Sequence, residues 1–226
     1  MTVIALIPAY NEASRIAAAV RDARSFANAV VVVDDCSRDR TGDVAREAGA
    51  VVLRHVINRG QGAALQTATE YALSALKADV VVHFDADGQM AGSEIPTMVE
   101  PILHGEADVV LGSRFLGKES NMPFTRWAAN RLARLFTLMI SGIGLTDTHN
   151  GFRALSRKAA QELTITLDRM AHASQVLDLI KVKRLRYVER PVTITYSKET
   201  LAKSQSSLRA FCIVKDILKD KFFTRV

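Results

Sequence analysis

Short apolar runs, rich in β-branched residues, alternate with longer amphipathic stretches through the first half of the 226-residue chain. This alternation most constrains the fold. The apolar runs are Val3–Ile7, Ala29–Val33, Val51–Leu53, Val80–Phe84 and Val109–Leu111. Helical spacing of apolar residues lies between most of them, at Ala13–Phe26, Thr41–Ala48, Gly62–Leu76 and Ser93–His104. The pattern predicts an α/β fold of βαβ units around a mostly parallel sheet, with Thr41 and Ser93 as helix N-caps.

The second half is less regular. A polar loop (Gly117–Pro123) leads into a basic helical stretch (Phe124–Met139). A helix is predicted near Ser174–Lys183, a strand over Val188–Tyr196 and a basic amphipathic helix over Ser206–Phe223. Neither an internal repeat nor a long linker is visible, so we expect one domain over residues 1–226.

Charge also divides the chain in the middle. Residues 1–112 carry a net charge of −6, and residues 113–226 carry +12. A basic half favours an anionic partner, such as nucleic acid, a phosphorylated small molecule or an anionic membrane, unless it is only a solubilising surface. Aromatic residues are not interleaved with the basic ones as base stacking requires, which argues against nucleic acid.

Composition and cysteine content narrow the class of protein further. With 48% apolar and 24% charged residues, the chain is not a disordered or fibrous protein. Two cysteines cannot build a disulfide framework, which favours a reducing cytoplasm. The longest uncharged apolar stretch, residues 135–145, is too short to span a bilayer.

Ligands of parallel α/β sheets bind beyond the carboxyl ends of the strands, so the residues that follow each apolar run are the candidates. Asp85 and Asp87, in the sequence DADGQ, follow the fourth run. Hard oxygen ligands suit Mg²⁺ or Mn²⁺, which can bridge the oxygens of a diphosphate, and Gln89 can add a neutral oxygen. The alternative is a solvated acidic turn.

Other strand ends carry weaker signals. After the second run, Asp34 and Asp35 are candidate ligands, and Asp35 can accept hydrogen bonds from a base or a ribose. After the first run, Tyr10 can stack on a base and Glu12 can bind a ribose hydroxyl, although Glu12 also fits a helix start. After the fifth run, Arg114 is suited to bidentate binding of phosphate.

Several common sites are excluded or disfavoured by spacing. The G-x-G-x-x-G pattern fails after Gly60 and Gly62, because Leu65 stands at the third glycine position, and no P-loop is present. This argues against a dehydrogenase and a P-loop kinase. The five histidines have no metal-ligand spacing. His83 is expected to be a core residue, and His149 is a possible substrate contact in the polar turn 146–150.

Six motifs, taken together and in order, resemble those of family 2 glycosyltransferases, and most closely the polyprenyl-phosphate (dolichol-phosphate type) sugar transferase branch. They are IPAYNE (7–12), VVDDCSRDRTG (32–42), NRGQGAALQTA (58–68), DADGQ (85–89), GSRF (112–115) and DTHNGFRAL (147–155). The resemblance covers about residues 3–196. It implies a GT-A fold, with a nucleotide-sugar-binding half (1–112) and an acceptor-binding half (113–226).

The resemblance also implies an activity and a partner set. The reaction would be metal-dependent, inverting transfer from a UDP- or GDP-linked sugar to a lipid-linked acceptor, polyprenyl phosphate in particular, in cell-surface glycan synthesis. The cofactor would be Mg²⁺ or Mn²⁺. The location would be cytoplasmic, or peripheral at the cytoplasmic face of the inner membrane, and a homodimer is possible. The alternatives are a glycan hydroxyl acceptor and a non-catalytic relative that binds nucleotide sugars.

Site roles are implied by position in these motifs. The nucleotide-sugar contacts would be Pro8, Tyr10, Glu12, Asp35, Asp85 and Ala86. The metal ligands would be Asp85, Asp87 and Gln89. The acceptor contacts would be Ser113, Arg114, Arg126, Asn130 and Arg131. The catalytic residues would be Asp87, Arg114, Asp147 and Arg153, the last within the G-F-R element 151–153.

Two departures from the family pattern leave alternatives open. Gln175 stands where many relatives carry a Glu, and Gln cannot act as a general base. Either the acceptor is an ionised phosphate that needs no base, or the base lies elsewhere, with Asp147 as the candidate, or activity is reduced. Several polyprenyl-phosphate transferases also carry C-terminal spans, which we do not expect here. The helix Ser206–Phe223 would then either lie on an anionic membrane or pack on the domain or in a dimer.

Overall fold

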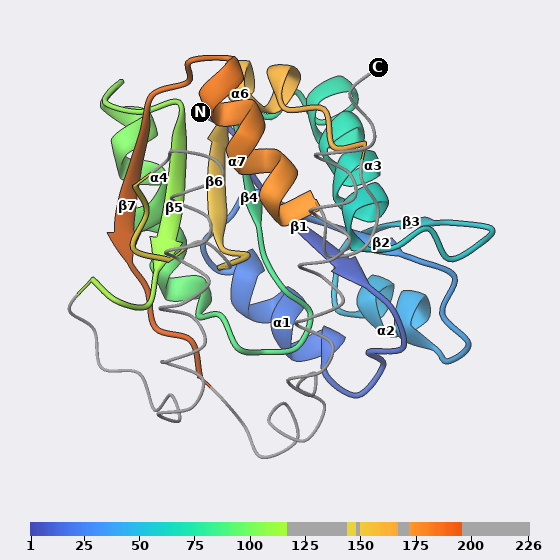
Figure 1. Ribbon diagram of the computed structural model, residues 1–226. Coiled ribbons are helices and arrows are strands. Elements are labelled where there is room, and N and C mark those ends of the chain that lie inside the picture. The colour runs from blue at the N-terminus through green and yellow to red at the C-terminus, as the bar shows by residue number, and fades with distance from the viewer. Residues whose placement is uncertain (117–143, 148–149, 167–171, 196–226) are drawn as a thin grey trace, which may run out of the picture.

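The computed structural model describes residues 1–116, 144–147, 150–166 and 172–195 (Figure 1). One sheet of seven strands runs through this part of the chain, in the order β3-β2-β1-β4-β6-β5-β7. The strands are β1 (Val3–Ala9), β2 (Ala29–Asp34), β3 (Val51–Arg54), β4 (Val80–His83), β5 (Val109–Ser113), β6 (Arg153–Ser156) and β7 (Tyr187–Pro191). The helices are α1 (Ile16–Arg24), α2 (Thr41–Glu47), α3 (Gln61–Ser74), the 3₁₀ turn η1 (Gly92–Glu94), α4 (Ile95–Leu103), α6 (Arg157–Glu162) and α7 (His172–Val182).

Strand direction brings the candidate residues to one edge of the sheet. β1 pairs in parallel with β2 and β4, β2 with β3, and β5 with β7, whereas β6 is antiparallel to both β4 and β5. Six strands therefore end at the same edge, and β6 begins there. The expectation of a mostly parallel sheet is confirmed, with β6 as the exception.

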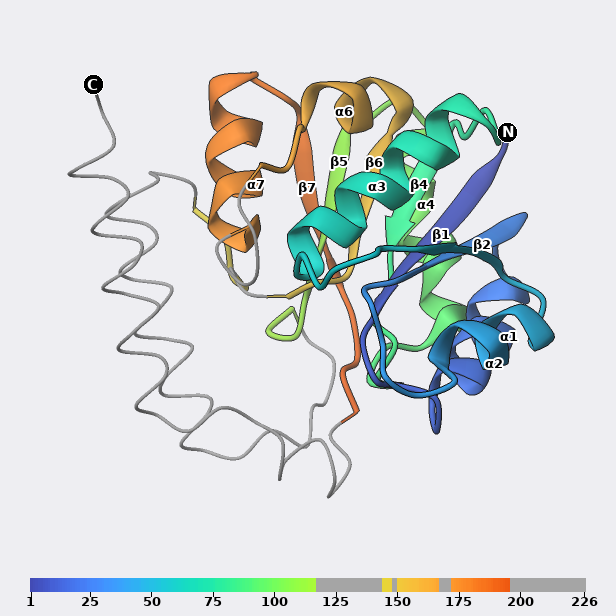
Figure 2. The ribbon, with the colours of Figure 1, turned by 90° about the vertical axis from the view of Figure 1, so that its right-hand side faces the viewer.

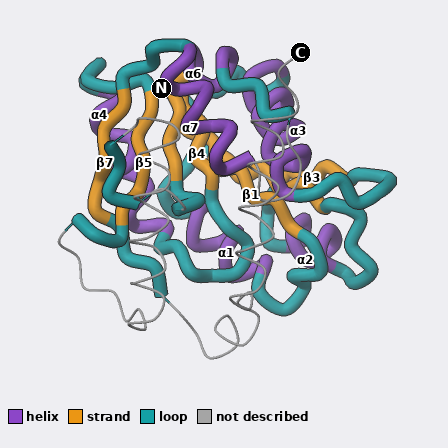
Figure 3. The backbone as a smooth tube through the Cα atoms, viewed as in Figure 1, coloured by secondary structure: helices purple, strands orange, loops and turns teal. Residues whose placement is uncertain are grey.

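Helices cover both faces of the sheet, as Figures 2 and 3 show. One apolar layer joins α1, α2 and α4 to one face, around Val20, Met98 and Phe152. The other joins α3, α6 and α7 to the opposite face, around Leu6, Leu65 and Ile180. Apolar residues alternate between these layers along β1, β2 and β4, which is why both faces are buried and these strands read as continuous apolar runs.

The five strands predicted in the first half and most predicted helices are confirmed. The strand predicted over Val188–Tyr196 forms β7 but ends at Pro191. Both predicted N-caps are wrong. Thr41 is the first residue of α2, which has no side-chain cap, and its hydroxyl instead accepts a hydrogen bond from the backbone N–H of Glu12 at 2.8 Å. Ser93 lies inside η1, before α4 begins. The predicted helices Phe124–Met139 and Ser206–Phe223 lie outside the described residues. Among the helices that are described, none is long and apolar enough to cross a membrane.

Candidate active site

A cavity of about 300 Å³ opens at the carboxyl edge of the central strands. Its lining comes from the segments that follow β1, β2 and β4 and from the start of α3: Pro8, Ala9, Tyr10, Glu12, Asp35, Gln61, Ala64, Asp85, Ala86 and Asp87. The six residues predicted to contact the nucleotide sugar all belong to this set. Four of the ten lining residues are carboxylates and none is Lys or Arg, so the cavity has an acidic wall.

Hydrogen bonds fix the loops after β1 and β2 to each other. Asn11, whose φ is 55°, donates its N–H to Ser37 Oγ (2.9 Å), and its Oδ1 accepts from Arg38 N (2.8 Å). Asp39 accepts from Ala13 N (3.2 Å) and Thr41 N (3.0 Å) and from the Thr41 hydroxyl. Partial burial acts to raise the pKa of Asp39, but these hydrogen bonds lower it on balance. The polar residues of this loop therefore hold the two loops together, and Asp39 also accepts from the first backbone N–H of α2.

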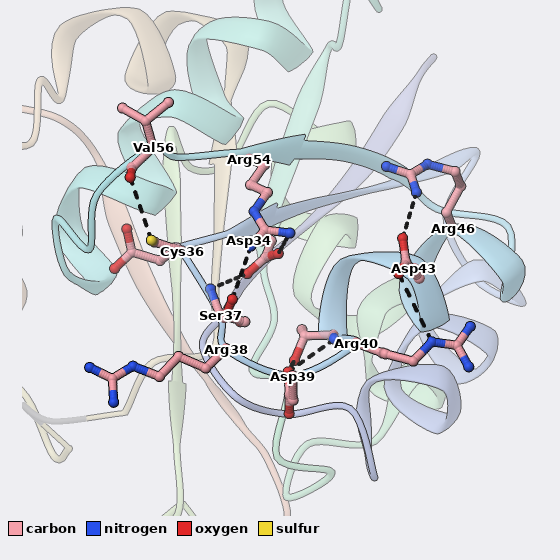
Figure 4. Close-up of polar contacts among 12 residues, drawn as sticks. Asp34, Cys36, Ser37, Arg38, Asp39, Arg40, Asp43, Arg46, Arg54 and Val56 are labelled. Atoms are coloured by element: carbon pink, nitrogen blue, oxygen red, sulfur yellow. Dashed lines mark hydrogen bonds and ion pairs between the residues drawn. The ribbon is translucent and has the colours of Figure 1, made fainter.

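The adjacent carboxylates Asp34 and Asp35 differ in environment. Asp34 is fully buried, accepts from Ser37 N at 2.9 Å and lies 3.7 Å from Arg54 Nη1 (Figure 4). Asp34 is not among the residues that line the cavity, so the structure places Asp35 and not Asp34 at this site. A Cβ at Gly42 would lie 2.9 Å from Asp34 Oδ2, so any larger residue at position 42 would clash with this carboxylate.

Asp35 does line the cavity and is held from several sides. Its Oδ1 contacts His55 Nδ1 (2.7 Å) and accepts from Arg59 N (2.9 Å), and its Oδ2 accepts from Gly60 N (2.7 Å). His55 Nε2 lies 3.0 Å from Thr67 Oγ1. The sequence reading missed His55. Parallel pairing of Asp34 with Arg54 places residues 35 and 55 side by side, so the register of β2 and β3 would have predicted the contact.

Asp85 and Asp87 lie after β4, as the DADGQ motif predicts. Asp85 Oδ1 accepts from Gln61 Nε2 at 3.2 Å, and Asp87 Oδ1 accepts from Gln89 N at 3.0 Å. Burial and, second, the charge of Asp87 raise the pKa of Asp85 to about 7, although Arg153 opposes the shift. A buried carboxyl group whose ionisation is opposed by a neighbouring carboxylate is a plausible ligand of a divalent cation, because the cation would favour the charged form.

The metal prediction is thus supported by the chemistry of two residues and not by a preformed cluster. In the described ranges, no group of three or more His, Cys, Asp or Glu could hold a metal ion. Gln89 lies outside the ten residues that line the cavity, and its carbonyl accepts a hydrogen bond from Thr195 N at 2.9 Å.

Arg153 supplies a buried positive charge behind the acidic wall. It begins β6 opposite His83 of β4, and both side chains are buried. Burial lowers the pKa of Arg153 to about 10, while the charges of Asp85 and Asp147 act to raise it, so the guanidinium stays charged at neutral pH. The preceding Gly151 approaches Asp85 closely, since a Cβ there would lie 3.2 Å from Asp85 Oδ2. The burial of His83 is as predicted.

A second polar cluster lies at the end of β5. Arg114 Nε and Nη2 donate to the two oxygens of Asp147 at 2.6 and 2.7 Å, and both side chains are largely buried. Ser113 Oγ, which is fully buried, lies 2.6 Å from Thr146 Oγ1. Glu189 of β7 accepts from Thr146 N (2.9 Å) and Asp147 N (3.2 Å). Glu189 was not predicted; its place in a strand beside β5 is the signal that was available.

This cluster bears on the predicted general base. Both oxygens of Asp147 accept hydrogen bonds from Arg114, so the structure shows Asp147 orienting that arginine. Gln175 on α7 binds Thr166 instead, with Oε1 accepting from the backbone N–H (3.0 Å) and Nε2 donating to the hydroxyl (2.6 Å). The predicted acceptor contacts Arg126, Asn130 and Arg131, and also His149, lie outside the described residues.

Comparison with known proteins gives a consistent result. Residues 4–164 match the family model described as glycosyl transferase family 2. The chain is 29% identical to a UDP-N-acetylglucosamine–dolichyl-phosphate N-acetylglucosaminyltransferase of Methanococcus voltae, over 94% of this chain and 93% of that protein. It is 31% identical to an undecaprenyl-phosphate mannosyltransferase of Micrococcus luteus, over 92% and 88% of the two chains.

A solved structure shows the same fold. The crystal structure of glucosyl-3-phosphoglycerate synthase from Mycobacterium tuberculosis, in complex with Mn²⁺, UDP and glucosyl-3-phosphoglycerate, superimposes with a TM-score of 0.74. The match covers 96% of this chain and 77% of that one at 19% sequence identity. The predicted GT-A fold is thereby confirmed.

Proposed function

We propose, since this chain belongs to glycosyl transferase family 2 and is a glycosyltransferase, that it moves a sugar from a nucleotide-diphosphate sugar to a polyprenyl phosphate, with inversion at the anomeric carbon. The observation that carries this proposal is the acidic cavity at the carboxyl edge of the sheet. The cavity is lined by four carboxylates, Glu12, Asp35, Asp85 and Asp87. They are all the acidic residues that the family motifs assign to the donor and the metal.

A negatively charged donor could bind beside this acidic wall only together with a cation. A pyrophosphate would be repelled by Asp85 and Asp87 unless a cation lay between them. These two residues would hold Mg²⁺ or Mn²⁺, with Gln89 as a further predicted ligand. The bound ion would neutralise negative charge on the leaving nucleoside diphosphate. The Mn²⁺ and UDP bound by the M. tuberculosis synthase, which has the same fold, support this arrangement.

The chain's own residues would position the two reactants. Tyr10 and Asp35, on two loops that are hydrogen-bonded to each other, would fix the nucleoside. Arg153, buried behind Asp85, would place a permanent positive charge near the diphosphate. Arg114, oriented by Asp147, would bind the acceptor phosphate. Holding both anions at fixed positions lowers the entropy cost of bringing them together.

The bond changes are those of a single displacement. An oxygen of the acceptor phosphate forms a bond to the anomeric carbon, while the bond between that carbon and the β-phosphate oxygen breaks. The nucleoside diphosphate leaves with the bonding electron pair. Attack from the face opposite the leaving group inverts the configuration.

A phosphate acceptor fits this site better than a hydroxyl acceptor. A hydroxyl must lose a proton to a base, whereas an ionised phosphate need not. Neither position expected to hold a base is suited to that role. Asp147 accepts hydrogen bonds from the Arg114 guanidinium, and residue 175 is a glutamine that is hydrogen-bonded to Thr166. The named activities of the M. voltae and M. luteus relatives, which concern dolichyl and undecaprenyl phosphate, support the same choice. Such an acceptor lies in a membrane, so we propose that the chain works at a membrane surface.

The test is transfer of radiolabelled sugar from UDP- and GDP-linked donors to polyprenyl phosphate with Mn²⁺, followed by extraction of the lipid product. Asp87→Asn should abolish transfer, a loss of at least about 10²-fold, because the donor diphosphate loses its cation. The matched control is Asp43→Asn on the exposed face of α2, where Asp43 pairs only with surface arginines in the described structure. Full activity of Asp87→Asn, or transfer to polyprenol but not to its phosphate, would overturn the proposal.

A further inference from the structure

The loop between β3 and α3, residues 55–60 (the 55–60 loop), presents two adjacent apolar side chains to solvent. Val56 is 92% exposed and Ile57 is 64% exposed. Single exposed apolar residues are ordinary at protein surfaces, but an adjacent pair at the tip of a loop is a candidate contact for an apolar phase.

The exposure of this pair is imposed by the fold, because hydrogen bonds hold the loop backbone on both sides of it. On one side, His55 N donates to Asp34 O (3.0 Å), and Cys36 Sγ lies 3.5 Å from Val56 O (Figure 4). On the other, Asn58 Nδ2 donates to Asp35 O (3.1 Å), and Arg59 N and Gly60 N donate to the Asp35 carboxylate. Val56 and Ile57 therefore cannot turn inward without breaking these contacts.

The 55–60 loop carries one positive charge, Arg59, in a half of the chain that is acidic overall. Residues 51–69 contain Arg54 and Arg59 and no Asp or Glu, whereas residues 1–112 as a whole carry −6. Arg59 is exposed, and Arg38, exposed on the neighbouring loop after β2, adds a second positive charge. Arg54 is directed back to the protein, because its guanidinium donates to Ser37 O (3.0 Å) and lies 3.7 Å from the buried Asp34 carboxylate. Apolar side chains at a tip with arginines beside them match an anionic lipid surface, which offers hydrocarbon behind a layer of phosphates.

The place of the loop determines what such a contact would do. β3 ends at the same edge of the sheet as β1, β2 and β4, and Gln61 and Ala64, just after the loop, line the cavity. A bilayer that touches the loop would therefore lie beside the entrance to the cavity.

We infer that the 55–60 loop docks on an anionic bilayer, with Val56 and Ile57 entering the interfacial layer and Arg59 and Arg38 facing the lipid phosphates. The choice of a membrane rather than a protein partner rests on the proposed function, because a polyprenyl phosphate reaches the cavity only from a bilayer. The loop then serves to hold the cavity entrance against the membrane that carries the acceptor.

The experiment measures partition of the full chain onto vesicles of mixed phosphatidylcholine and phosphatidylglycerol, and onto vesicles of phosphatidylcholine alone. The double variant Val56→Ser/Ile57→Ser should bind the anionic vesicles about tenfold more weakly than the parent chain. The matched control is Val182→Ser at the end of α7, which removes a side chain that is 74% exposed, and it should bind as the parent does. Arg59→Gln should weaken binding to the anionic vesicles and leave binding to phosphatidylcholine unchanged.

A second measurement locates the contact. A polarity-sensitive dye on Ile57→Cys, in a Cys36→Ser/Cys212→Ser background, should shift its emission to the blue on adding anionic vesicles, and the same dye on Val182→Cys should not. Unchanged partition of the double variant, or no shift at residue 57, would overturn the inference, and a shift caused by a second copy of the chain without lipid would point to dimerisation instead.

Failure of the proposed function would look different. Transfer to a short-chain prenyl phosphate in detergent tests the chemistry without a bilayer, and the double variant should match the parent there while losing transfer in vesicles. Absence of transfer by the parent chain in detergent would contradict the proposed function, whereas vesicle binding would still decide the role of the loop.

Discussion

At the scale of single residues, the site depends on charged groups whose burial lowers the free energy of unfolding. Asp85 is partly buried beside Asp87, and its pKa of about 7 shows that the protein without metal disfavours the charged form. Arg153 opposes this shift and does not cancel it. Removing two acidic groups from water next to each other is unfavourable unless a ligand repays the cost, and for this reason such pairs mark functional sites.

The raised pKa of Asp85 predicts a pH dependence of stability in the presence of a chelator. The fold favours the neutral form, so this stabilisation is complete below the unfolded-state pKa, near 3.8, and is lost as the pH rises through about 7. Between pH 5.5 and 8.5 the loss attributable to Asp85 should be about 2 kcal/mol. Urea unfolding at several pH values measures it. Asp85→Asn removes the ionisable group, so the free energy of unfolding of this variant should depend less on pH. An equal pH dependence in the variant and the parent chain would refute the attribution to Asp85.

Asp147 offers a second prediction at this scale, because it pairs with Arg114 in a largely buried, bidentate contact. Asp147→Asn leaves the guanidinium without its counter-charge and should lower the free energy of unfolding by about 3 kcal/mol. Thermal unfolding should show a fall of roughly 6–12 °C for a chain of this size. A large loss of transfer with an unchanged midpoint would instead indicate that Asp147 acts as a base on the acceptor.

At the scale of elements, strands and helices followed from the sequence because apolar runs and helical spacing are local signals. The error at Thr41 has a different origin. A Thr at the start of a helix resembles an N-cap, but its hydroxyl contacts Glu12 N on a loop 29 positions earlier in the chain. The same limit applies to His55 and Glu189, whose partners become evident only once β3 lies on β2 and β7 on β5.

This correction is testable with a pair of substitutions. Thr41→Val removes the acceptor for Glu12 N in a buried position and should cost about 1–2 kcal/mol of stability. Ser93→Ala removes an exposed hydroxyl that does not cap α4, and its effect should stay within about 0.5 kcal/mol. Denaturant unfolding of both variants compares them directly, and a cost for Ser93→Ala equal to that for Thr41→Val would restore the capping interpretation.

At the scale of the whole molecule, the sheet converts widely separated motifs into one site. The acidic segments after β1, β2 and β4 meet because those strands are parallel neighbours, whereas Arg153 reaches the same edge only because β6 runs in the opposite direction. The motifs predicted which residues gather at this edge. They did not predict the pairing of Arg114 with Asp147, since that contact depends on where residues 144–147 lie beside β5 and β7.

The central claim is that an acidic cavity binds a nucleoside diphosphate through a divalent cation, and calorimetric titration tests it most directly. UDP and GDP are each titrated into the full chain with Mn²⁺ and with a chelator, and the titration is repeated with Asp87→Asn and Asp43→Asn. The account predicts that one nucleotide binds only with Mn²⁺, that Asp87→Asn abolishes this binding and that Asp43→Asn preserves it. Equal binding with and without the metal, or binding by Asp87→Asn as tight as by the parent chain, would contradict it.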